Sequence, residues 1–93
     1  MYFVYIMTNP THTVLYIGFT SNLPKRVWEH REHVVSGFTH DYNCIKLIYY
    51  EAGEDYEGVL EREKQLKGWT RKKKERLIQQ MNPHWDDLYD TIE

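Results

Sequence analysis

Residues 2–19 read YFVYIMTNPTHTVLYIGF, two apolar stretches separated by a short polar one. Aromatic and β-branched side chains fill residues 2–7 and 14–19, which is a composition typical of β-strands. Asn9-Pro10 interrupts the chain between them, because proline has no N–H to give to a sheet and Asn-Pro favours a turn. The stretch therefore predicts an antiparallel hairpin with a longer loop, with Gly18 near the end of its second strand.

The residues after the hairpin predict a first helix. Ser21 or Asn22 can cap its N-terminus, and residues 36–37, Ser-Gly, are expected to end it. Its buried ridge is expected to consist of three apolar residues at helical spacing: Leu23, Val27 and Val34.

The second half of the chain predicts one more strand and two more helices. CIKLIYYE at 44–51 has the composition of a strand, and residues 53–67 form a helix with acidic residues in its first turn. Gly68 ends that helix, and Thr70 caps another over 71–81. The order β-β-α-β-α-α over one domain of 93 residues predicts an α+β fold, a small, mostly antiparallel three-stranded sheet flanked by helices.

Charge is distributed unevenly along the chain. The formal net charge is −2, yet residues 62–76 hold eight of the twelve Lys and Arg residues and only two acids. Such segregation can present a basic face to phosphates while the rest of the surface stays acidic. Trp69 lies in this segment and is either core or a surface on which a base stacks. The expected phosphate-contacting residues are Arg71, Lys72, Lys73, Lys74 and Arg76.

Cysteine usage and hydropathy give an expected compartment. Cys44 is the only cysteine, so the chain forms no internal disulfide, and the longest apolar run, residues 2–7, is far too short to span a membrane. We therefore expect a cytoplasmic protein.

Two features of the predicted helices stand out as candidates for chemistry. Arg26 and His30 are four residues apart and so share one helical face, which is either a solvated charged face or the edge of a site near Tyr16. Glu63 interrupts an apolar stripe on the second helix. A carboxylate there needs a partner: an ion pair with Arg62 or Lys67, a contact with Arg26, or a divalent metal.

Taken in order, these residues resemble the GIY-YIG nuclease domain, in particular its small stand-alone bacterial members. Tyr16-Ile17-Gly18 reproduces the second half of the motif, and Phe3-Val4-Tyr5 occupies the first half with Phe in place of Gly. The resemblance covers about residues 2–85 and continues through four downstream positions: Arg26, His30, Glu63 and Asn82.

The resemblance implies a divalent-metal-dependent endonuclease that hydrolyses DNA phosphodiester bonds, with a structure-selective role in DNA repair or recombination. Glu63 would bind Mg²⁺ or Mn²⁺. Tyr5 and Tyr16 would activate water, one as general base and the other as its positioner. Arg26 would stabilise charge in the transition state, and His30 would position phosphate or shuttle a proton.

The resemblance also implies supporting features. Gly18 would let the chain turn beside the site, and Asn82 would hold the site architecture by hydrogen bonds. No separate DNA-binding domain fits in 93 residues, so specificity would come from DNA structure or from a partner protein.

Three other functions are compatible with the residues. The first is a non-catalytic nucleic-acid-binding module that retains the nuclease fold. The second is a His/Cys metal site, although the spacings match no strong zinc pattern; its ligands would be His30, His33, His40 and Cys44. The third is a protein-interaction module that uses the acidic face.

Overall fold

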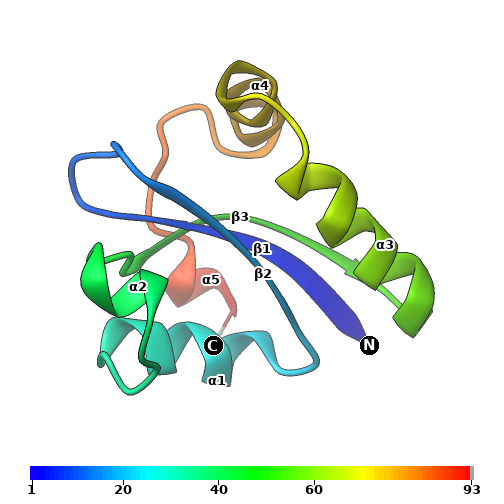
Figure 1. Ribbon diagram of the computed structural model, residues 1–93, viewed down its shortest axis with the longest axis horizontal. Helices are drawn as coiled ribbons and strands as arrows, with labels where there is room; N and C mark the ends of the chain where they lie inside the picture. The colour runs from blue at the N-terminus through cyan, green and yellow to red at the C-terminus, as the bar shows by residue number, and fades with distance from the viewer. Residues whose placement is uncertain (93) are drawn as a thin grey trace.

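A three-stranded antiparallel sheet forms the centre of the molecule (Figure 1), and the computed structural model describes residues 1–92. The strands are β1 (Tyr2–Thr8), β2 (Leu15–Thr20) and β3 (Lys46–Gly53), in the order β2-β1-β3. The hairpin predicted from residues 2–19 is therefore β1-β2. Because β1 is central, β2 keeps one edge free of strand pairing.

Helices cover both faces of the sheet. The helices are α1 (Leu23–Arg31), α2 (Phe38–Asp41), α3 (Tyr56–Lys67), α4 (Arg71–Met81) and α5 (Tyr89–Ile92). In Figure 1, α3 and α4 lie above the sheet, and α1, α2 and α5 lie below it. The predicted fold class and the order β-β-α-β-α-α are confirmed, with the short helices α2 and α5 as additions.

Alternation along β1 divides the core into two clusters. Val4 and Ile6 pack with Leu66 of α3 and Ile78 of α4. Tyr5 and Met7 point to the other face, where they pack with Leu23 and Val27 of α1. Successive side chains of a strand point to opposite faces, so one buried strand supplies both cores.

The first helix is shorter than the sequence predicts. Asn22 caps α1 by accepting a hydrogen bond from the Lys25 N–H, as expected, but the helix ends at Arg31. His33 then has a φ of 56°, a left-handed conformation that ends a helix. The predictions that residues 36–37 end the helix and that Val34 is buried are therefore wrong, and Val34 is exposed.

The segment after α4 folds back onto β3. The Asn82 side-chain amide donates to the carbonyl oxygens of Ile48 at 3.1 Å and Asp86 at 2.8 Å. Its oxygen accepts from the Asp86 N–H at 3.0 Å, and the Leu88 N–H donates to the Leu47 carbonyl at 2.8 Å. Asn82 is buried and ties α4, β3 and the last residues of the described chain together. Within residues 1–92, none of the helices has the length and apolar character needed to cross a bilayer.

Candidate functional site

Gly18 and Tyr5 face each other on paired strands. They are register partners in the β1-β2 ladder, and the Tyr5 ring passes directly over the Gly18 backbone. A Cβ atom at position 18 would lie 2.4 Å from both Cζ and the hydroxyl oxygen of Tyr5, closer than real Cβ contacts come. The bare backbone of Gly18 is therefore what allows the Tyr5 phenol to reach the β2 side of the sheet.

The Tyr5 hydroxyl is part of a buried chain of hydrogen bonds. Its oxygen lies 2.8 Å from Nε2 of His30, and Nδ1 of His30 lies 2.9 Å from the Thr39 hydroxyl. Burial, together with the nearby Arg26 charge, lowers the pKa of His30 to about 4, and the Glu29 carboxylate opposes the shift. The imidazole is therefore neutral at physiological pH, so it donates one of these two bonds and accepts the other.

Thr39 was not predicted as a member of the site. It is buried on α2, nine residues beyond His30, and no periodic pattern in the sequence marks it. Only the early end of α1 and the turn at Gly37, whose φ is 100°, bring the chain back to His30. A hydroxyl residue two positions after a glycine is a signal too common to have identified it.

Tyr16 lies beside this hydrogen-bonded chain, nearer to solvent. Its ring centre is 6.2 Å from that of Tyr5 and 5.5 Å from that of His30. Tyr16 is half-buried, whereas Tyr5 is fully buried. The two phenols therefore meet one imidazole, and Tyr16 is the more accessible of the two.

Charges from helices on both faces of the sheet act on the Tyr5 phenol. Burial raises the pKa of Tyr5 above its usual value, and Tyr16 raises it further through its charge and a hydrogen bond. The Arg26 guanidinium on α1 lowers this pKa, and the Glu63 carboxylate on α3 raises it. Arg26 and Glu63 therefore both lie within electrostatic reach of the Tyr5 oxygen, although their helices cover opposite faces.

Both of these charged groups have local partners. The Arg26 Nε atom lies 3.2 Å from a Glu29 carboxylate oxygen, and Glu63 is 3.2 Å from the Lys67 ammonium one turn along α3. The Glu63 side chain is only 12% exposed, while Lys67 is 54% exposed. Of the partners expected for Glu63, the structure therefore shows an ion pair with Lys67. Arg62 instead pairs with Glu51.

The donor atoms near Glu63 fit one kind of metal and not another. One largely buried carboxylate within electrostatic reach of the Tyr5 oxygen suits Mg²⁺ or Mn²⁺, which keep several waters and also take phosphate oxygens as ligands. Zinc is held in proteins by three or four His, Cys, Asp or Glu side chains. Among residues 1–92 no three such side chains form a group that could hold a metal. The alternative His/Cys site is not assembled: His30 already bonds Tyr5 and Thr39 through its two ring nitrogens.

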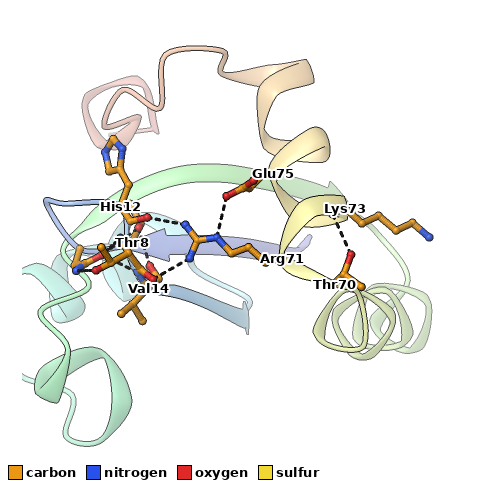
Figure 2. A network of polar contacts seen from close by, with 9 residues as sticks. Thr8, His12, Val14, Thr70, Arg71, Lys73 and Glu75 are labelled. Atoms are coloured by element: carbon orange, nitrogen blue, oxygen red, sulfur yellow. Dashed lines mark hydrogen bonds and ion pairs between the residues drawn. The ribbon is translucent and has the colours of Figure 1, made fainter.

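Arg71 holds the hairpin loop rather than pointing into solvent. Figure 2 shows its guanidinium between α4 and the β1-β2 loop. One nitrogen donates to the Thr13 carbonyl at 2.9 Å and another to the His12 carbonyl at 2.6 Å, while Nε contacts Glu75 at 3.0 Å. The N–H groups of Arg71, which the sequence suggests as phosphate contacts, thus hold the hairpin loop that precedes Tyr16 in place.

The other cations of residues 62–76 point in several directions, because successive residues of a helix are rotated by about 100°. Lys74 lines a cavity of about 240 Å³ together with Lys67 and Tyr16. Lys73 points away from the hairpin (Figure 2) and lies 4.1 Å from the centre of the Trp69 ring, which packs against the α3-α4 core. Lys72 and Arg76 are exposed.

A model of the GIY-YIG catalytic domain matches residues 1–76. The chain belongs to the GIY-YIG family. Among its relatives, a UPF0213 protein of Syntrophus aciditrophicus is 38% identical over 87% of the chain and 92% of the relative. One from Natronomonas pharaonis is 31% identical, over 83% and 89%.

A solved structure shares the fold. The solution NMR structure of a UPF0213 protein from Bacillus halodurans superimposes with a TM-score of 0.59, covering 94% of this chain and 93% of that one. The two chains are 23% identical. The GIY-YIG fold described above is therefore shared by a member of the same group of small proteins.

Proposed function

We propose that the protein is a divalent-metal-dependent endonuclease that hydrolyses DNA phosphodiester bonds, with a structure-selective role in DNA repair or recombination. The observation that carries this proposal is the convergence at Gly18. Two phenols and a neutral imidazole meet there, within reach of one guanidinium and one carboxylate, in a chain of the GIY-YIG family. Membership of a nuclease family supports DNA as the substrate.

Tyr16 is the better placed of the two phenols to activate water. Tyr5 is fully buried and its pKa is raised, so its anion is unfavourable. Tyr16 instead is half-buried and lines a cavity with Lys67 and Lys74, so water and a phosphate can reach its oxygen. We therefore assign Tyr16 as the general base that takes a proton from the attacking water.

Tyr5 and His30 would hold Tyr16 in position. With its proton on Nε2, the His30 ring donates to the Tyr5 oxygen and accepts the Thr39 O–H on Nδ1. The Tyr5 O–H is then free to donate to the oxygen of a deprotonated Tyr16, which takes the proton from water, and the buried imidazole fixes the orientation of Tyr5. In this proposal Tyr5 and His30 orient the base and Tyr16 transfers the proton.

Arg26 would stabilise negative charge on the phosphate as water attacks. Its ion pair with Glu29 is partly exposed, and such pairs contribute only about 0–1 kcal/mol, so a phosphate can replace Glu29 as the partner. The guanidinium offers several N–H donors in a fixed fork that matches phosphate oxygens.

Glu63 would hold Mg²⁺ or Mn²⁺ near the Tyr5 and Tyr16 oxygens. When bound, the metal supplies positive charge that neutralises the phosphate and its leaving oxygen. Lys67 must release Glu63 for this to happen, and its exposed side chain can turn toward a phosphate. The remaining phosphate contacts would come from Lys74 and from three exposed or outward-pointing residues: Lys72, Lys73 and Arg76.

The Glu63-Lys67 ion pair also favours a second function. A carboxylate that keeps its lysine does not bind a metal, and the protein would then be a non-catalytic nucleic-acid-binding module. A cleavage panel separates the two functions: purified protein with single-stranded, duplex, flap and junction DNA in Mg²⁺, Mn²⁺ or EDTA. The nuclease proposal predicts metal-dependent products that disappear in Arg26→Ala. Binding without cleavage of any substrate supports the module.

A further inference from the structure

Two exposed aromatic rings extend from Tyr16 along α2, outside the set of residues assigned above. Phe38 is 44% exposed and its ring stacks on Tyr16, with ring centres 5.9 Å apart and planes at 28°. Tyr42 is 53% exposed and lies 4.6 Å from Phe38. Adjacent exposed rings form a contiguous apolar patch, and such a patch marks a candidate contact surface, whereas a single exposed ring does not.

Positive charge adjoins these rings. Phe38 and Tyr16 line the same cavity of about 240 Å³ as Lys67 and Lys74. The cavity thus combines aromatic and aliphatic walls with two ammonium groups. Its composition matches a nucleotide, whose base offers a flat face for stacking and whose phosphate offers negative charge.

We propose that Phe38 and Tyr42 form a stacking site for the base of an unpaired nucleotide adjacent to the scissile phosphate. Bases inside a duplex are already stacked on each other, so their faces are not available to protein side chains. Unpaired bases are free to stack on aromatic rings, and such stacking tolerates any base. The substrate class is therefore DNA with a single-stranded segment at the cleavage position. This choice of ligand rests on the proposed function.

The backbone before Phe38 supports this arrangement. Gly37 has a φ of 100° and a ψ of −145°, a conformation open almost only to glycine, and it turns the chain into α2. The following helix places Phe38 and Tyr42 one turn apart on the same face, while Thr39 points inward to His30. One turn thus links the site's hydrogen-bonded chain to the proposed stacking surface.

The test measures binding in EDTA, so that it does not depend on cleavage. Fluorescence anisotropy compares labelled single-stranded and duplex oligonucleotides of one sequence with wild type, Phe38→Ala and Tyr42→Ala. The matched control is Trp28→Ala, which removes a 48% exposed ring on α1 that is not among the cavity's lining residues. Phe38→Tyr keeps an aromatic ring and tests rescue.

We expect Phe38→Ala and Tyr42→Ala to weaken single-strand binding about 5- to 150-fold, the equivalent of about 1–3 kcal/mol. Duplex binding should change less than about twofold, and Phe38→Tyr and Trp28→Ala should behave as wild type. Equal losses for both DNA forms, an equal loss in Trp28→Ala, or unchanged single-strand affinity in a folded Tyr42→Ala variant would overturn the proposal. A selective loss in a protein that cleaves nothing would keep the stacking site and refute the nuclease.

Discussion

Replacing Gly18 with alanine would place a methyl group inside the Tyr5 ring. The added Cβ would lie 2.4 Å from two atoms of the phenol and 2.8 Å from a third. Tyr5 is fully buried between β2 and α1, and its hydroxyl bonds to His30, so the ring has little room to move away. Relief requires a shift of the strand or loss of the Tyr5–His30 hydrogen bond.

Both routes lower the free energy of unfolding. Overpacking a close-packed core costs about 1–3 kcal/mol, and a buried polar group left without its partner costs about 1–3 kcal/mol. We expect Gly18→Ala to lose about 2–4 kcal/mol, since the ring relieves part of the clash by giving up its hydrogen bond. For a domain of this size that corresponds to a fall in Tm of roughly 8–30 °C.

A double-mutant cycle followed by urea denaturation isolates the clash. Tyr5→Leu removes the ring atoms that the new methyl meets, so Gly18→Ala should cost less than about 0.5 kcal/mol in that background. Gly68→Ala is the control, because a Cβ there lies 3.5 Å from its nearest neighbour and the φ of −82° suits any residue. Additive effects of Gly18→Ala and Tyr5→Leu, within about 0.5 kcal/mol, would refute the close approach.

Three further predictions concern the pH response, the two phenols and the hairpin clamp. Folding holds the pKa of His30 near 4 against about 6.5 in the unfolded chain, so the unfolded state binds more protons between these values. Stability should therefore fall by up to about 3 kcal/mol from pH 7 to pH 4. His30→Asn should flatten that slope in urea melts, and identical slopes would show that His30 does not titrate this way. Tyr16→Phe should reduce cleavage about 10²- to 10⁴-fold with stability kept within about 0.5 kcal/mol; Tyr5→Phe should also destabilise, because it leaves Nε2 of His30 without its partner. Near-wild-type cleavage by Tyr16→Phe would assign its phenol to packing alone. Arg71→Ala should speed amide hydrogen exchange in the β1-β2 loop and leave the salt dependence of DNA binding unchanged, whereas Lys72→Ala should reduce that slope by about one. A matching reduction in Arg71→Ala would make Arg71 a phosphate contact.

The elements that carry the site follow from local patterns. Alternation and an Asn-Pro turn predict the hairpin, and the caps at Asn22 and Thr70 lie where the sequence indicates them. Antiparallel pairing then opposes Tyr5 to Gly18. Val34 was misplaced because apolar spacing predicts a continuing helix, whereas the chain turns at His33 through a backbone conformation that its sequence does not signal.

The features that sequence reasoning missed are contacts between distant residues. Arg71 bonds the His12 and Thr13 carbonyls across almost sixty positions, and a contact of that separation leaves no periodic trace. A run of consecutive cations suggests a single basic surface. Because neighbouring residues of a helix point in different directions, Lys73 instead lies over the Trp69 ring and Lys74 lines the cavity beside Tyr16. Thr39 enters the site only because a short helix, too brief for any periodic signal, follows α1.

The most direct test of the proposed hydrolytic centre is the single-turnover cleavage rate of a flap substrate in Mg²⁺ for Glu63→Gln. Glu61→Gln is the control, since Glu61 is an exposed acid on the same helix. Glutamine keeps the shape of Glu63 and removes its charge, so we predict at least a hundredfold loss for Glu63→Gln and no more than a twofold change for Glu61→Gln. Cleavage by Glu63→Gln at the wild-type rate would contradict the assignment of this carboxylate as the metal ligand and separate α3 from the site.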